Sequence, residues 1–216
     1  MPETLSAARD IHASLIRNEP MQARSTARLA ALLDAAAAVV AEIGYERLTT
    51  AMVAEGAGAS IGTVYRYFPD RIAVLQSLAA RNEERLTERL LAVVSDPQHE
   101  DWISALGAAY DVLVEFFRTE VGFASVRLGD VLDLRPAEGE PRNSVVARTV
   151  FDVLAERFGF DDVDRARVGF ELTFEAADAL IARAFARDTQ GDEVLLEQAR
   201  VAMRAVLAQY LPIAEA

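Results

Sequence analysis

A run of hydrogen-bonding side chains lies between residues 60 and 68, in the segment Ser-Ile-Gly-Thr-Val-Tyr-Arg-Tyr-Phe. The spacing predicts a short helix from Ile61 to Phe68 that buries Val64 and Phe68, because residues four apart share one helical face. The hydroxyl and guanidinium groups are left for the other faces, and such groups bind DNA phosphates and base edges. Gly62 costs a helix about 1 kcal/mol relative to alanine, which indicates that another molecule approaches the backbone there. The segment therefore predicts recognition of nucleic acid. The alternative is a helical hairpin with solvated aromatic side chains.

A second helix is predicted immediately before this segment. Thr49 and Thr50 can cap its N-terminus, and the sequence Gly56-Ala57-Gly58-Ala59 ends it before Ser60 opens the next helix. Beyond Phe68, Pro69 stops the chain from continuing as a helix and Asp70 can cap another one. The local pattern is a helix, a tight turn and a helix.

Residues Arg24 to Leu78 resemble the DNA-binding head of the TetR family of bacterial transcriptional regulators. The segment LLDAAAAVVAEIGYERLTT resembles the first helix of the family, Ala54 to Ser60 resembles the turn, and Gly-Thr-Val-Tyr-Arg-Tyr-Phe-Pro-Asp-Arg resembles the recognition helix and the start of the fourth helix. Arg71 stands where the family usually has lysine, and Ala51 and Met52 replace residues that are often basic or polar. The resemblance, together with the side-chain chemistry, predicts the following DNA contacts: Arg24, Arg28, Thr49, Thr50, Ser60, Ile61, Gly62, Thr63, Tyr65, Arg66, Tyr67 and Arg71.

The composition is that of a compact protein without disulfides, thiolate zinc sites or a cysteine nucleophile. The chain has 216 residues, of which 52% are hydrophobic, and it contains no cysteine. No secretory leader or membrane-length apolar stretch is present, so we expect a cytoplasmic protein with no membrane partner. We also expect no metal site and no cofactor. The net charge is −12, but residues 1–72 hold seven arginines and eight acids, so the charge lies mainly beyond residue 72. An acidic body beside a neutral head predicts modest non-specific affinity for DNA.

The periodicity of apolar residues predicts an all-α fold with about nine helices and no strands. The predicted organisation is an N-terminal extension over residues 1–23, a three-helix head with a helix-turn-helix over residues 24–71, and a helical ligand-binding and dimerisation domain over residues 72–216. The helices expected after the head are Asp70 to Val94, Trp102 to Phe117, Val121 to Leu134, Val145 to Phe158, Val163 to Arg187 and Asp192 to Leu211.

Two further sites follow from the family resemblance. Aromatic residues of the body are predicted to line a cavity for a small, mainly apolar molecule, although they could equally fill an ordinary core. These residues are Trp102, Tyr110, Phe116, Phe117, Phe123, Phe151, Phe170 and Phe174. The last two helices are rich in alanine, which permits close helix packing and predicts a homodimer interface, with packing inside one chain as the alternative. The interface residues are Ala176, Ala179, Ala199, Ala202 and Ala205.

The predicted function is a ligand-responsive regulator, most simply a repressor released from a palindromic double-stranded DNA operator by a small-molecule effector. An all-helical enzyme or small-molecule-binding protein with no DNA role is the main alternative. An enzyme would need a catalytic set, and we find none: the histidines are His12 and His99, and there is no glycine-rich phosphate loop or nucleophile elbow. A helical protein-interaction module is a third possibility, but it would leave the polar face of residues 60–68 unexplained.

Overall fold

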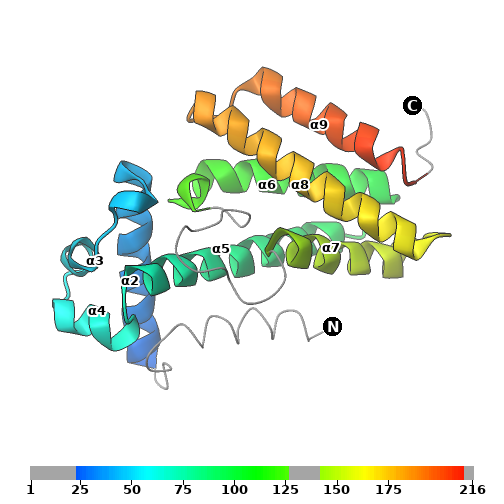
Figure 1. The fold of residues 1–216 in the computed structure, drawn as a ribbon. Coiled ribbons are helices and arrows are strands. Elements are labelled where there is room, and N and C mark those ends of the chain that lie inside the picture. Colours follow the sequence, from blue (N-terminus) through cyan, green and yellow to red (C-terminus); the bar gives the residue numbers. More distant parts are fainter. Residues whose placement is uncertain (1–22, 127–141, 212–216) are drawn as a thin grey trace. The chain divides into compact units, whose positions relative to one another are not determined.

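Helices make up all the regular structure of residues 23–126 and 142–211, the part of the chain that the computed structural model describes (Figure 1). Two 3-10 turns, η1 (Tyr45–Arg47) and η2 (Phe123–Ser125), accompany the α-helices. The all-α fold with a helix-turn-helix near its N-terminus is therefore confirmed. The α-helices are α2 (Ala23–Ile43), α3 (Thr50–Gly56), α4 (Ile61–Tyr67), α5 (Arg71–Val94), α6 (Trp102–Thr119), α7 (Arg142–Phe158), α8 (Val163–Arg187) and α9 (Glu193–Leu207).

The first compact unit contains the described residues up to Glu84 together with residues 120–126. In it α2 packs on α3, and α3 packs on α4. Its core consists of aliphatic and aromatic side chains from α2, α3, α4 and the first turns of α5, joined by Leu48 and Val126 from connecting segments. The η2 turn packs against α2.

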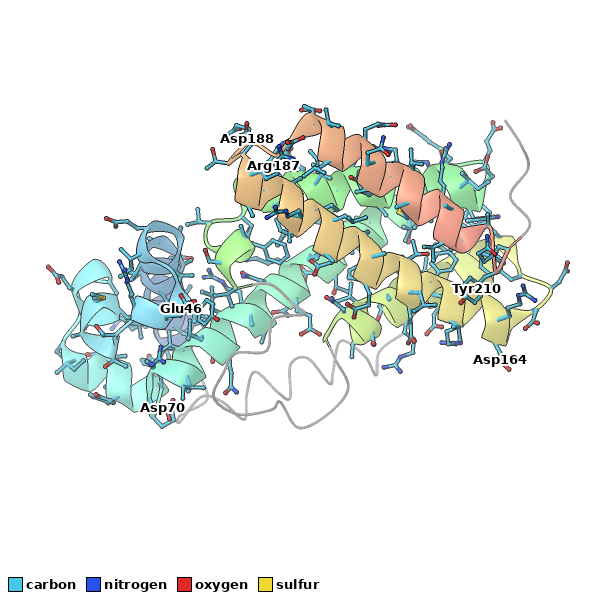
Figure 2. The ribbon with its side chains drawn as sticks, turned by 45° about the horizontal axis from the view of Figure 1, so that its top comes forward. Glu46, Asp70, Asp164, Arg187, Asp188 and Tyr210 are labelled. Atoms are coloured by element: carbon cyan, nitrogen blue, oxygen red, sulfur yellow. The ribbon has the colours of Figure 1, made fainter. Side chains whose placement is uncertain are left out.

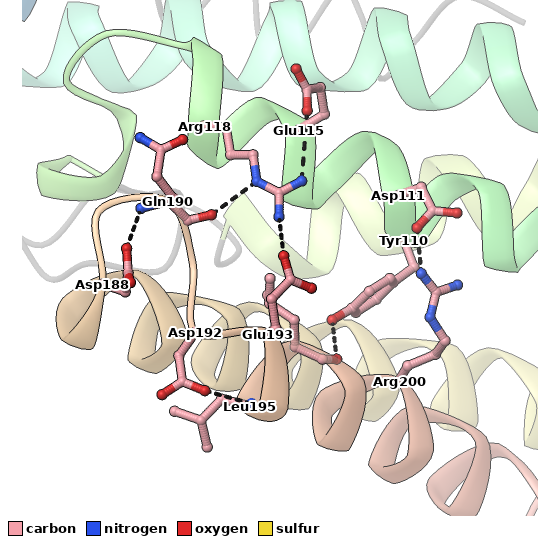
Figure 3. A network of polar contacts seen from close by, with 11 residues as sticks. Tyr110, Asp111, Glu115, Arg118, Asp188, Gln190, Asp192, Glu193, Leu195 and Arg200 are labelled. Atoms are coloured by element: carbon pink, nitrogen blue, oxygen red, sulfur yellow. Dashed lines mark hydrogen bonds and ion pairs between the residues drawn. The ribbon is translucent and has the colours of Figure 1, made fainter.

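The second compact unit contains residues 85–119 and the described residues after 141. In it α8 contacts α6, α7 and α9, and Figure 1 shows α8 lying between α9 and α7. A polar network also joins α6 to α9 (Figure 3). Arg118 donates to the carbonyl oxygen of Gln190 at 2.9 Å and Tyr110 donates to that of Leu196 at 2.6 Å. Arg200 forms an ion pair with Asp111. These contacts connect α6 with α9 and with the segment that leads into it.

Short polar side chains determine where several helices begin. The Asp70 carboxylate, labelled in Figure 2, accepts from the backbone nitrogens of Ile72 and Ala73 at 3.0 and 2.9 Å and so caps α5. Asp162 and Asp192 cap α8 and α9 in the same way. Each carboxylate satisfies amide donors that the first helical turn leaves unpaired. The caps at Asp70 and Asp192 agree with the predicted starts of those two helices.

One predicted helix differs from the structure. Residues Val121 to Leu134 were expected to form an α-helix, but the described part contains only the η2 turn, preceded by Gly122 at φ +80° and followed by Val126 in a non-helical conformation. The rest of that span and the extension over residues 1–22 lie outside the described residues. No helix within residues 23–126 and 142–211 combines the length and the apolar character needed to cross a membrane.

Candidate nucleic-acid interface and ligand cavity

The helix-turn-helix is formed by α3, the residues 57–60 and α4. Thr49 Oγ1 accepts from the backbone nitrogen of Met52, and Ser60 Oγ accepts from that of Thr63, each at 3.2 Å. These bonds cap the two helices, as the sequence predicted. Gly58, with φ +55°, makes the turn between them in the left-handed region that glycine adopts without strain.

The two faces of α4 have different surroundings. Val64 is buried in the core of the first unit, as is Phe68 just beyond the helix. Ile61 and Tyr65 are each 44% exposed, although large apolar and aromatic side chains usually bury more of their surface. Thr50 Oγ1 donates to the Tyr65 hydroxyl at 3.3 Å, which positions Tyr65 beside the start of α3. Arg66 is also exposed, so α4 presents an aliphatic, a phenolic and a guanidinium group together.

Tyr67 does not lie on this exposed face, contrary to the sequence prediction. Its side chain is only 5% exposed and belongs to the core of the first unit. The Tyr67 hydroxyl lies 2.9 Å from Ser25 Oγ and 3.4 Å from the Ser25 carbonyl oxygen. The ring therefore packs α4 against the first turn of α2. Its predicted contact with DNA remains a prediction.

Gly62 has room for a side chain within its own protein. A methyl group built at this position would meet only Ser60 Oγ, at an ordinary contact distance of 3.8 Å. Its backbone is not in the positive-φ region, so neither packing nor conformation requires glycine here. The missing side chain leaves the backbone at the start of α4 open to a molecule outside the chain.

The predicted arginine contacts have different surroundings. Arg24 and Arg28 are exposed in the first two turns of α2. Arg71 is half-buried, and its Nη1 donates to the carbonyl oxygens of Tyr45 and Glu46 at 3.4 and 3.3 Å. A guanidinium carries five N–H donors, so Arg71 can hold the η1 segment and also contact a phosphate. Sequence reasoning missed this structural role.

The second unit contains a hollow lined by α6, α7, α8 and single residues of α5 and α9. The hollow is partly open to solvent. The centre of a water molecule can move in about 40 Å³ of it, and all the space between its atoms, open solvent included, is about 460 Å³. No charged side chain is among the described residues that line it. Those residues are Leu90, Leu106, Ala109, Tyr110, Leu113, Ala147, Val150, Phe170, Thr173, Phe174, Ala177 and Met203.

The predicted aromatic residues are divided between this cavity and the surrounding core. Tyr110, Phe170 and Phe174 line the cavity. Phe151 is fully buried against Phe170, with ring centroids 5.2 Å apart. Trp102 packs against Phe160 and Phe170 and lies beside a smaller hollow between α6 and α9. Phe117 stacks on Phe185, and the Arg89 guanidinium lies over the ring of Phe116. Phe123 belongs to the first compact unit. Most lining residues are small or aliphatic, and no sequence signal separates them from core residues.

Tyr110 is the residue of this cavity with a perturbed ionisation. Burial raises the pKa of its phenol from 10.0 to about 12, and nearby Arg200 only partly opposes that effect. The hydroxyl stays protonated and donates to the Leu196 carbonyl oxygen at 2.6 Å. Among the described residues, no cluster of three or more histidine or acidic side chains is placed to hold a metal ion.

The predicted interface alanines are not equivalent. Ala179 and Ala205 are exposed, and Ala176 and Ala202 are half-buried. Ala199 is fully buried inside the chain, so its methyl group packs within the protomer, and its predicted place in a dimer interface remains a prediction. Larger apolar side chains are exposed on the same two helices: Val168 and Leu172 on α8, and Val194 and Val201 on α9, with exposures from 47 to 72%.

Family models match both compact parts of the chain. The model described as "Tetracyclin repressor-like, C-terminal domain" matches residues 100–211, just over half of the 216 residues. The chain belongs to the TetR family. A second model of this family, "Bacterial regulatory proteins, tetR family", matches residues 32–78, which include α3 and α4. The resemblance seen in the sequence is therefore confirmed.

One solved structure agrees with this assignment, and two known proteins are similar to parts of the chain. A crystal structure of a TetR-family transcriptional regulator from Streptomyces coelicolor is 33% identical, covers 85% of this chain and 99% of its own, and has a TM-score of 0.70. The chain is 43% identical over 58 residues to the transcriptional repressor KstR of Rhodococcus jostii, a match that spans 27% of either protein. It is 30% identical over 146 residues to the nucleoid occlusion factor SlmA of Haemophilus ducreyi, covering 62% of this chain and 69% of that protein.

Proposed function

We propose that this TetR-family protein is a cytoplasmic transcriptional repressor that binds a palindromic operator and releases it when a small, mainly apolar molecule enters the cavity of the second unit. The observation that carries the DNA-binding part is the exposed face of α4, where Ile61, Tyr65 and Arg66 surround an open backbone at Gly62. The repressor named among its relatives supports the direction of regulation. The proposal assigns no enzymatic activity to the chain.

Substitution of two arginines tests DNA recognition. Operator fragments are first selected from random genomic DNA by gel shift and sequenced. Arg66→Ala should then relax preference at one base pair and cost about 1 to 3 kcal/mol, because a bidentate base contact is lost. Arg71→Ala should weaken binding to all sequences and lower the salt slope by about one, because a phosphate contact is lost.

The control is Arg89→Ala, which removes the same charge from the second unit, where the guanidinium lies over the Phe116 ring. This variant should bind the operator as the wild type does. Equal operator affinity and sequence preference for wild type and Arg66→Ala at matched salt would reject the assignment of α4 as the recognition helix.

The exposed apolar side chains of α8 and α9 support a homodimer through these helices. Association with a second copy would remove these side chains from water, which favours binding. A two-fold dimer would place two heads on operator halves about 34 to 36 Å apart or somewhat more. Ala205→Arg should yield a monomer in sedimentation velocity, because Ala205 is exposed on α9. Ala38→Arg, on an exposed position of α2, is the matched control, and a monomeric wild type at micromolar concentration would contradict the proposal.

One helix contributes to both sites. Arg71 stands at the first position of α5, and Leu90 of the same helix forms part of the cavity wall. A ligand that shifts α5 should weaken operator binding by a typical coupling of about 5- to 150-fold. By reciprocity the operator must weaken ligand binding by the same factor. Calorimetry that gave one ligand affinity with and without operator DNA would exclude this route of regulation.

A further inference from the structure

Thr173 is a residue of the cavity wall and carries a buried hydroxyl with no hydrogen-bond partner among the described residues. The residue is 2% exposed, lines the cavity from α8, and its Oγ1 has no hydrogen-bond partner among the described residues. Helical threonines commonly donate to the carbonyl four residues earlier. Thr119 and Thr149 do so here, at 2.8 Å from the oxygens of Glu115 and Val145. Thr173 does not form this bond.

Among the described lining residues, Thr173 carries the one side-chain hydroxyl that no hydrogen bond uses. Tyr110 is the only other polar residue among the described lining residues, and its hydroxyl already donates to the Leu196 carbonyl. A buried water needs two to four polar partners, so one hydroxyl holds water poorly. A ligand with one oxygen needs only one partner, and its remaining surface can lie against the apolar wall.

The charge and size of the cavity restrict the ligand further. An ionised group would be buried without a counter-charge, because no charged side chain is among the described lining residues. The space of about 40 Å³ that a water centre can reach suits a small molecule, such as a single ring or a short branched chain. We propose that Thr173 is the polar recognition residue for the effector, which is a neutral, mainly apolar molecule with one hydroxyl or carbonyl oxygen bound to Thr173 Oγ1. This inference rests on the ligand-binding part of the proposed function.

A matched pair of probes tests the assignment. Phenol and toluene have nearly the same shape and differ by a hydroxyl in place of a methyl group. Calorimetry measures both affinities for wild type and for Thr173→Val, which keeps the branched shape and removes the hydroxyl. The phenol-to-toluene affinity ratio should fall about 2- to 12-fold in Thr173→Val, the range expected for one neutral hydrogen bond.

Three further variants locate the effect. Thr173→Ser keeps the hydroxyl and should keep the wild-type ratio. Thr149→Val removes a hydroxyl that is already bonded within α7, and it should leave the ratio unchanged. Ala177→Val adds bulk to the cavity wall and should weaken both probes. Without ligand, Thr173→Val should melt at a higher temperature than wild type, because it removes a buried hydroxyl with no partner.

The possible failures are distinguishable. If both probes bind wild type and the ratio is the same in Thr173→Val, the role of Thr173 is wrong while the cavity remains a ligand site. A lower melting temperature for Thr173→Val without ligand would also count against it, because the hydroxyl would then have a stabilising partner. If neither probe binds wild type, the cavity does not bind such molecules, and both this inference and the ligand assignment of the proposed function are overturned.

Discussion

Replacing Tyr110 with phenylalanine should change the stability of the second unit with a sign that depends on pH. Tyr110 is 4% exposed, and its hydroxyl joins α6 to α9 by donating to the Leu196 carbonyl oxygen at 2.6 Å. Near neutral pH the phenylalanine variant loses this bond and should be about 0.5 to 1.5 kcal/mol less stable.

At high pH the phenylalanine variant should instead be more stable than wild type. Burial raises the pKa of Tyr110 from 10.0 in an unfolded chain to about 12 in the folded one, so the folded state holds the proton more tightly. The associated stability is fully present below pH 10 and is lost as pH rises through the folded pKa. Two pKa units correspond to about 2.7 kcal/mol. This loss exceeds the free energy that the hydrogen bond contributes. The free energies of unfolding of wild type and Tyr110→Phe should therefore become equal between about pH 10 and pH 11.

Urea unfolding at a series of pH values measures this difference. The fluorescence of Trp102, the single tryptophan of the chain, reports on the same compact unit as Tyr110. Subtracting the curves of the two proteins cancels the other groups that titrate at high pH. A stability difference that stayed constant from pH 7 to pH 11 would show that folding does not raise the pKa of Tyr110.

Two further substitutions test the packing of the first unit. Tyr67→Phe should lower the free energy of unfolding, measured in urea, by about 0.5 to 1.5 kcal/mol, because the hydroxyl contacts with Ser25 are lost. Tyr67→Ala should lower it by about 3 to 5 kcal/mol, because a core ring is lost. An unchanged free energy of unfolding in Tyr67→Ala would place the ring outside the core. Gly122→Ala should cost more than Gly58→Ala in the same assay. Both glycines have positive φ, so alanine at either position would be strained by about 1 to 2 kcal/mol. Only at Gly122 would the added methyl group also meet backbone, 2.8 Å from the Ala37 oxygen. Equal losses would contradict the close approach of η2 to α2.

Sequence periodicity located α4 and its core contacts but misplaced Tyr67. Val64 and Phe68 are four residues apart, so helical geometry alone assigns them to one face. Tyr67 is buried in the core of the first unit, and Ser25, 42 positions earlier in the chain, lies against its hydroxyl. A contact between segments so far apart cannot be read from a local pattern. The predicted helical start at Val121 is wrong for a related reason, since its apolar residues resemble a helical stripe whereas the η2 turn packs against α2.

The cavity was harder to predict than the fold. Aromatic residues attract attention as candidate ligand contacts, yet much of the wall comes from Ala109, Ala147 and Ala177, whose small side chains leave space between helices. An apolar stripe predicts that a helix face packs against other helices. It does not show where the packed side chains leave a gap between the helices. The alanines of α9 illustrate the same problem, because Ala199 packs inside the chain and Ala205 is exposed.

The separation of the two faces of α4 also affects how this protein can evolve. Val64 and the neighbouring Tyr67 and Phe68 are buried and stabilise the fold, whereas Ile61, Tyr65 and Arg66 are exposed and contribute less buried surface to it. Changes at the exposed positions can therefore accumulate without a large loss of stability. A gene duplicate could acquire a new operator while its fold and cavity stay intact. A library randomised at Ile61, Tyr65 and Arg66 should accordingly consist mostly of folded proteins, from which regulators of altered sequence preference can be selected.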